Sequence, residues 1–227
     1  MKREIINTGD GSKTIYIPEW NEHYHSKHGA VQEAKHVFLE TGLQYYIDTR
    51  DANNREPIAI LEMGFGTGLN ALLTFFKGKE LGLSIVYEGV EAFPISAQEI
   101  EAMDYGSLLT HTNSDIVYNF LHETSWELAN PISDEFVLKK RKQEFEDIAD
   151  VDCFDLIYFD AFGPRVQPDL WTEAIFSKMY VALKKNGVLT TYCAQGAARR
   201  AMQAVGFKVE RLPGPPGKRE MLRATKV

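Results

Sequence analysis

Beyond residue 57, short apolar runs alternate with segments whose apolar residues recur at helical spacing. The apolar runs predict seven strands, at Ile58–Leu61, Ser84–Val90, Glu135–Lys139, Phe154–Phe159, Val188–Cys193, Phe207–Leu212 and Glu220–Thr225. The helical spacing predicts helices at Leu69–Phe76, Ser96–Met103, Trp171–Leu183 and Ala197–Val205. This alternation is typical of an α/β fold with a mostly parallel sheet covered on both faces. A Pro/Gly turn at 213–217 joins the last two strands, so we expect an antiparallel hairpin there.

The first 57 residues follow a different pattern, and we expect them to form a small N-terminal extension packed on the core. Thr14–Ile17 is predicted as a short strand that ends at Pro18. Val31–Tyr46 is predicted as a helix, with Gly42 as its break. Residues 58–227 then form the main domain. The stretch Ser107–Ser133 fits neither pattern, and its structure stays open.

Composition excludes several classes of protein. A hydrophobic content of 44% and a charged content of 25% are typical of a globular chain. No window approaches the roughly 20 apolar residues that a membrane-spanning helix needs. The start of the chain carries no secretion signal, and the two cysteines form no CxxC motif. We therefore expect a cytoplasmic location.

Charge is unevenly distributed along the chain. Residues 184–227 contain ten lysines and arginines but only two carboxylates, a net charge of +8 where the whole chain carries −7. Asymmetry of this kind indicates a polyanionic partner such as nucleic acid, or simply a basic, solvated surface. On charge alone both readings stay open.

Three glycines at alternate positions, Gly64, Gly66 and Gly68, follow a predicted strand and open a predicted helix. Glycine lets the backbone turn sharply and approach a ligand, and the helix start presents free N–H groups. The dinucleotide fingerprint GxGxxG fails, because Leu69 stands in its last place. The loop, which Glu62 precedes, instead resembles the first motif of class I (Rossmann-like) methyltransferases, whose cofactor is S-adenosyl-L-methionine. From this resemblance we expect Glu62, Gly64, Phe65, Gly66, Thr67, Gly68 and Asn70 to bind the cofactor.

An acid at the end of the second strand is expected to bind the ribose hydroxyls of the cofactor. Glu88 and Glu91 are both available, and we prefer Glu91 because it ends the strand.

Asp160 and Phe162 follow the most apolar strand. Ligands of open parallel sheets bind at the carboxyl ends of the strands, so Asp160 is expected to meet the glycine loop and the cofactor. A carboxylate there can orient an amine or accept its proton, and an aromatic ring can stabilise a developing cation. We therefore predict Asp160 and Phe162 as catalytic residues.

Several further motifs make the resemblance more specific. They are Tyr24-His25-Ser26, Glu62-Met63-Gly64-Phe65-Gly66-Thr67-Gly68-Leu69-Asn70, Val90-Glu91-Ala92-Phe93-Pro94, Asp160-Ala161-Phe162-Gly163-Pro164, Arg199-Arg200 and Gly217-Lys218-Arg219-Glu220-Met221. Together they span almost the whole chain, which resembles the methyltransferase half of the MnmC family in its stand-alone, MnmD-like form.

The resemblance implies methylation of the aminomethyl nitrogen of wobble 5-aminomethyl-2-thiouridine in tRNA, giving 5-methylaminomethyl-2-thiouridine. Bifunctional relatives also carry a flavin oxidase domain, for which 227 residues leave no room. We therefore expect no flavin, and an upstream tRNA modification enzyme that forms the amine. No metal is expected either, because no Cys or carboxylate partner is evident near His23, His25 and His28.

The resemblance also implies roles for residues outside the glycine loop. We expect Tyr24 and Ser26 to line the substrate pocket, and Arg199, Arg200, Lys218 and Arg219 to contact tRNA phosphates. One position departs from the family pattern: relatives place Gly-Asp after the third strand to contact adenine, where this chain has Lys142-Gln143. Gln143 is the expected adenine contact, with Glu144 as its alternative.

Two rival functions stay open. One is a methyltransferase or aminopropyltransferase acting on a free small amine, because polyamine synthases share the expected fold and use an Asp after the fourth strand. The other is a non-catalytic, cofactor-binding partner of RNA. The basic segment at 184–227 favours tRNA over a free amine, and an intact Asp160 speaks against a non-catalytic role.

Overall fold

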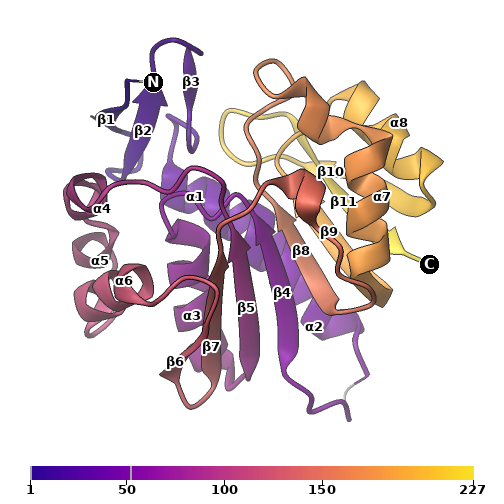
Figure 1. The fold of residues 1–227 in the computed structure, drawn as a ribbon, viewed down its shortest axis with the longest axis horizontal. Helices are drawn as coiled ribbons and strands as arrows, with labels where there is room; N and C mark the ends of the chain where they lie inside the picture. The colour runs from indigo at the N-terminus through magenta and orange to yellow at the C-terminus, as the bar shows by residue number, and fades with distance from the viewer. Residues whose placement is uncertain (1, 52) are drawn as a thin grey trace.

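The computed structural model describes residues 2–51 and 53–227. Its centre is an eight-stranded sheet with the order β10-β11-β9-β8-β4-β5-β7-β6 (Figure 1). In chain order the strands are β4 (Ile58–Met63), β5 (Ile85–Val90), β6 (Ala129–Ser133), β7 (Phe136–Arg141), β8 (Phe154–Phe159), β9 (Leu183–Thr191), β10 (Phe207–Pro213) and β11 (Glu220–Lys226). The five strands from β9 to β7 run parallel, and β11 lies antiparallel between β9 and β10. The class I methyltransferase fold and its C-terminal hairpin are thus confirmed.

The sheet has one strand more than predicted. The stretch Ser107–Ser133, left open from the sequence, contains the end of α5 (Tyr105–Leu108), then α6 (Ser114–Glu123) and the edge strand β6. Strand β6 contains Pro131, which a sheet tolerates at an edge because its missing N–H breaks no ladder. A polar edge strand with a proline lacks the apolar signature of the other strands.

A continuous helical segment runs from Ala30 to Thr49, as α1 (Ala30–Ala34), the π-helical η1 (Lys35–Gln44) and α2 (Tyr45–Thr49). The predicted break at Gly42 is wrong. Gly42 is buried, and a Cβ there would lie 3.1 Å from Thr190 Oγ1 of β9. The glycine therefore lets the helix pack closely on the sheet instead of ending it.

The other helices are α3 (Leu69–Leu81), α4 (Ala97–Met103), α7 (Glu173–Ala182) and α8 (Gly196–Ala204), with short turns of 3₁₀ helix at η2 (Phe145–Asp147) and η3 (Pro168–Trp171). The helix predicted at Trp171–Leu183 is shorter than expected at both ends. Trp171 lies in η3, and Leu183 already belongs to β9, which pairs with Phe154 of β8.

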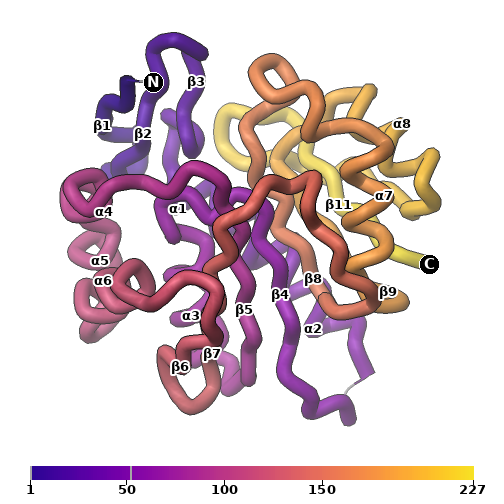
Figure 2. The backbone as a smooth tube through the Cα atoms, in the orientation of Figure 1, coloured from indigo at the N-terminus to yellow at the C-terminus, as the bar shows by residue number. Residues whose placement is uncertain are grey.

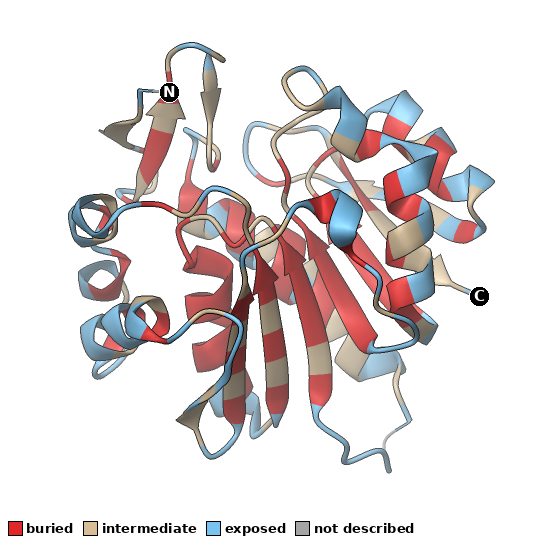
Figure 3. Cartoon of the chain, viewed as in Figure 1, coloured by how far each residue is buried: buried red, intermediate tan, exposed pale blue. Residues whose placement is uncertain are grey.

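Two hydrophobic clusters cover the two faces of the sheet (Figure 3). Alternation along β4 sends Ile58 and Ile60 to the cluster with η1 and α3, and Leu61 and Met63 to the cluster with α7 and α8. By the same alternation, Glu62 at the end of β4 points to the α3 face. This matters for the site, because α3 begins directly after the glycine loop.

A separate antiparallel sheet of β1 (Glu4–Asn7), β2 (Lys13–Ile17) and β3 (Glu22–His23) lies above the carboxyl ends of the central strands (Figure 1). Arg165 fastens it by donating to the carbonyl oxygens of Trp20 and Asn21, at 2.8 and 2.9 Å. The division of the chain at residue 58 stays a proposal. Within the described ranges, every helix is too short or too polar to cross a membrane.

Candidate active site

A cavity of about 550 Å³ opens at the carboxyl ends of β4, β5 and β8. One side is formed by the glycine loop (Gly64, Phe65 and Gly66) and by Glu91 with its neighbours. The N-terminal segment contributes Arg3, Trp20, Tyr24 and His25, and the loop after β8 contributes Asp160 and Phe162. The structure therefore brings together most of the predicted cofactor and catalytic residues.

The glycine loop has the backbone conformation that the sequence predicts. Gly64, Gly66 and Gly68 have φ angles of 94°, 50° and 73°, which disfavour any side chain. A Cβ on Gly64 would lie 2.8 Å from the carbonyl oxygen of Asp160. Glycine thus lets the loop pass directly beside the end of β8.

Glu91 ties the loop to the end of β5. Its carboxylate accepts the N–H of Gly66 and the N–H of Phe93, both at 2.9 Å. A carboxylate offers about four lone-pair sites, so these bonds leave room for two hydroxyl donors. This geometry fits the predicted contact with ribose.

Three predicted cofactor residues, Glu62, Thr67 and Asn70, support the loop instead of lining the cavity. Phe65 lines the cavity, and its ring is buried against Gly89 of β5. Thr67 is buried and bonds its hydroxyl to His25 Nε2 at 2.9 Å. Glu62 is buried on the α3 face and accepts bonds from Asn70 Nδ2 and Tyr87 Oη, at 2.8 and 2.9 Å. Burial raises the pKa of Glu62 well above its ordinary value.

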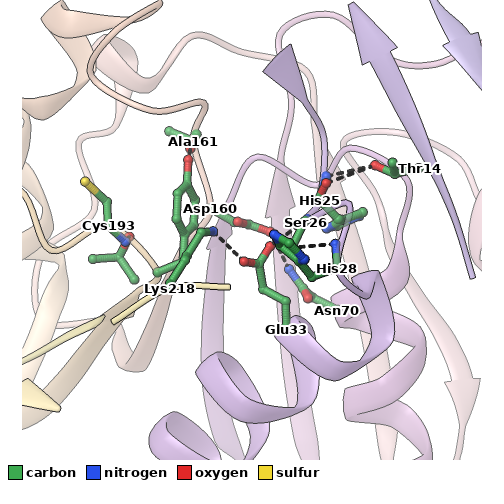
Figure 4. Close-up of polar contacts among 12 residues, drawn as sticks. Thr14, His25, Ser26, His28, Glu33, Asn70, Asp160, Ala161, Cys193 and Lys218 are labelled. Atoms are coloured by element: carbon green, nitrogen blue, oxygen red, sulfur yellow. Dashed lines mark hydrogen bonds and ion pairs between the residues drawn. The ribbon is translucent and has the colours of Figure 1, made fainter. Parts of the chain in front are cut away.

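Asn70 links the buried Glu62 to the cavity. Its Nδ2 also donates to Asp160 Oδ2 at 2.9 Å (Figure 4), so one amide holds the carboxyl groups that end β4 and β8. Burial, and after it the negative charge of Glu33, raise the pKa of Asp160 to about 7, against the opposing effects of the bond from Asn70 and the charge of Lys218. Asp160 therefore changes its charge near neutral pH, as a general base for an amine requires.

Three aromatic rings form the outer wall of the cavity. The Phe162 ring meets the Tyr24 ring edge-on at 5.0 Å and the Trp20 ring at 5.4 Å. The Arg3 guanidinium lies 5.8 Å from the centre of the Tyr24 ring. Trp20 and Arg3 were not predicted, because a single aromatic or basic residue outside any motif does not indicate a binding site.

The predicted adenine contact differs from the prediction in detail. Glu144 and Phe145 line the cavity, whereas the Gln143 side chain accepts a bond from Arg141 Nε at 3.2 Å. Gln143 Nε2 is buried without a hydrogen-bond partner in the described structure. An unused donor beside the cavity wall fits a ring nitrogen of adenine, so these residues suit the cofactor even though the contact stays a prediction.

The predicted substrate and tRNA residues fall into two groups. Arg200 and Arg219 are exposed and Arg199 is partly exposed, and within the described ranges none of the three forms an ion pair. Ser26 and Lys218 are placed differently from the prediction. Ser26 Oγ accepts the N–H of His28 at 3.2 Å, and the Lys218 ammonium pairs with Glu33 inside the protein.

No group of three or more His, Cys, Asp or Glu side chains in the described ranges is arranged to hold a metal ion. The absence of a metal and of a flavin stays a prediction.

Comparison with known proteins agrees with this geometry. A family model described as S-adenosyl-L-methionine-dependent methyltransferase matches residues 133–227. The bifunctional protein MnmC of Leptospira interrogans, named for tRNA 5-methylaminomethyl-2-thiouridine biosynthesis, is 29% identical over 95% of this chain. The crystal structure of MNMC2 from Aquifex aeolicus superposes with a TM-score of 0.77 at 25% identity, over 98% of this chain and 70% of that one. The chain is thus similar to MnmC proteins along nearly its whole length.

The chain spans about a third of the length of the curated bifunctional relatives that it matches, 34% in the Leptospira protein. Spermidine synthase from Thermotoga maritima has the same fold, with a TM-score of 0.59 at 16% identity, over 99% of this chain and 68% of that one. At that identity the likeness to spermidine synthase concerns the fold alone.

Proposed function

We propose that the chain transfers a methyl group from S-adenosyl-L-methionine to the aminomethyl nitrogen of wobble 5-aminomethyl-2-thiouridine in tRNA. The product is 5-methylaminomethyl-2-thiouridine, and an upstream modification enzyme supplies the amine. The observation that carries the proposal is the position of Asp160, which faces the cavity beside the glycine loop with a pKa near 7. The names of the relatives supply the substrate.

When bound, the cofactor supplies an electrophilic methyl group on a sulfonium. The task of the protein is to hold a neutral amine in line with it. Asp160 accepts a hydrogen bond or a proton from that amine, so the nitrogen lone pair is free. Asn70 fixes the carboxyl from behind, and the ring of Phe162 stabilises the positive charge that develops on nitrogen.

The rate of methyl transfer is expected to rise with pH, with a midpoint near 7. Below its raised pKa the carboxyl of Asp160 is protonated and cannot act as a base. Above that pKa it is ionised and can accept the proton of the amine. The measurement is kcat for saturating tRNA between about pH 5.5 and 9. A flat profile, or one that falls across neutral pH, would contradict the role of Asp160 as a base.

The aromatic wall suits a nucleobase that has left its stack. Trp20 and Tyr24 come from the N-terminal extension and face Phe162 across the mouth of the cavity. Bases stack on aromatic side chains at about 1–3 kcal/mol each. A wobble base in the anticodon loop is single-stranded and can enter such a pocket.

Replacing Trp20 by Ala is therefore expected to raise KM for tRNA by about fivefold or more, with a smaller change in kcat. Steady-state kinetics with tRNA as the varied substrate measures this. Phe120→Ala, which removes an exposed ring from α6, is the matched control and should leave KM unchanged. Equal effects of the two substitutions would remove Trp20 from the base pocket.

Arg199, Arg200 and Arg219 are the proposed contacts to tRNA phosphates. Their guanidinium groups have no carboxylate partner within the described ranges, so they are available to a polyanion. The remaining chain is strongly acidic and disfavours tRNA elsewhere.

The direct test incubates the protein with labelled cofactor and tRNA from cells blocked before this methylation, followed by nucleoside analysis. Label in 5-methylaminomethyl-2-thiouridine is the expected result. Label in free polyamines but not in tRNA would favour the free-amine reading that the spermidine synthase fold keeps open. Cofactor binding without transfer to either would favour the non-catalytic reading.

A further inference from the structure

Glu33 and Lys218 form an ion pair beside Asp160 (Figure 4). Glu33 belongs to α1 and is only 5% exposed. One of its carboxylate oxygens accepts the N–H of Ser26 at 2.9 Å, and the other pairs with the Lys218 ammonium. A buried carboxylate needs such partners, because an unpaired charge away from water is costly.

Lys218 reaches this position from the turn at 213–219, which joins β10 and β11. Figure 2 shows the turn extending toward the N-terminal segment. His36 Nε2 bonds to the carbonyl oxygen of Pro213 at 2.8 Å, and Gly217, with φ of 85°, packs against the ring of His28. Three contacts therefore fasten the turn to residues 28–36, at the start of the long helical segment.

Lys218 also contacts the end of β9. Its Nζ lies 3.7 Å from the centre of the Tyr192 ring, and Tyr192 Oη donates to the carbonyl oxygen of Ala161 at 2.8 Å. Ala161 directly follows Asp160. The Lys218 ammonium is thus linked through the Tyr192 side chain to the backbone next to Asp160.

We propose that Glu33 and Lys218 are positioning residues of the methyl-transfer site, and that Lys218 acts on Asp160 inside the protein instead of on tRNA phosphate. The pair ties the turn between β10 and β11 to α1 and places one negative and one positive charge near Asp160. The inference rests on the proposed function, because it assigns the pair to the base of that reaction.

Other polar groups face Asp160 from the surrounding elements. They are Asn70 of α3, Glu62 of β4, Tyr87 of β5, Tyr105 of α5 and Tyr192 after β9. Burial raises the pKa of Glu62 and of these tyrosines. Burial is also the largest influence on the pKa of Asp160, and Glu33 and Lys218 are the charged side chains that modify it.

The two members of the pair act on Asp160 with opposite signs. Glu33 raises the pKa of Asp160, and Lys218 lowers it. Lys218→Met should raise the pKa of Asp160, whereas Glu33→Gln should lower it. A nearby charge typically moves a carboxyl pKa by about one unit or more. Loss of packing alone gives no reason for shifts in opposite directions.

The test is a ¹³C NMR titration of the carboxyl groups in aspartate-labelled protein, with the Asp160 signal identified by its loss in Asp160→Asn. Opposite shifts in Lys218→Met and Glu33→Gln, with Lys218→Arg close to the unmodified protein, are the expected result. Lys208→Met removes an exposed lysine of β10 and should change nothing. Shifts of the same sign, or none, would overturn the proposal.

The titration needs no tRNA, so its outcome is separate from that of the methylation assay. If Lys218→Met fails to fold in a thermal unfolding check, Glu33→Gln and Lys218→Arg still decide the matter. In an active enzyme the midpoint of the kcat profile should move with the measured pKa. If Lys218→Met weakens tRNA binding but leaves the pKa of Asp160 unchanged, Lys218 contacts tRNA phosphates and the proposal is wrong.

Discussion

Asp160→Asn is expected to lower kcat for methyl transfer by about 10²-fold or more, while the affinity for S-adenosyl-L-methionine changes little. The substitution keeps an oxygen that accepts the bond from Asn70 Nδ2 but removes the group that takes the proton of the amine. General-base catalysis contributes about 10²–10⁴-fold. Single-turnover kinetics with tRNA measures the rate, and calorimetry with the cofactor measures the affinity.

Asp169→Asn serves as the control for this substitution. Asp169 is exposed in η3, beyond the loop that carries Asp160, and its loss removes one carboxylate of the same kind. The control should keep full activity. If Asp160→Asn instead loses cofactor affinity as strongly as rate, Asp160 is a binding residue and the proposed mechanism fails.

The second large effect concerns the glycine loop. Gly64→Ala is expected to weaken cofactor binding by more than about tenfold, equivalent to about 1.4 kcal/mol. Its Cβ would lie 2.8 Å from the Asp160 carbonyl oxygen, so the loop and the end of β8 must separate. Both segments line the cavity, and a shift of either one misplaces the cofactor contacts. The measurement is the Kd for the cofactor.

Gly11 offers a matched control for the strain of a positive φ. Its φ is 83°, close to the 94° of Gly64, but a Cβ there meets no atom within 4 Å. Gly11→Ala should therefore lower stability by a similar strain term without affecting Kd. Equal losses of affinity in both variants would show that strain, and not the approach of the loop to β8, limits binding.

The sequence predicted the parts of the fold that alternate strongly. Strand β8 was predicted at its observed bounds, Phe154–Phe159, because five of its six residues are apolar or aromatic, with Asp155 as the exception. The edge strand β6 was missed, since an edge position tolerates Pro131 and needs no apolar run. Gly42 was misjudged because helix propensity says nothing about how closely a helix packs on a sheet.

The candidate site was predictable where function depends on local backbone geometry. The positive φ angles of the glycine loop follow from its sequence. Contacts between distant residues do not follow from the sequence. Lys218 and Glu33 are 185 residues apart, and only the fold brings them together. The same holds for Trp20, whose place at the cavity depends on Arg165 holding the N-terminal sheet.

Two separate stretches of the chain line the cavity, the N-terminal segment and the loops after the central strands. The proposed cofactor side comes from the loops after β4 and β5, whereas Trp20 and Tyr24, on the proposed substrate side, come from the N-terminal segment. Mutations in that early stretch can reshape which nucleophile enters without disturbing the machinery that presents the methyl group. Such a separation allows a lineage to acquire new acceptors while its donor chemistry stays constant.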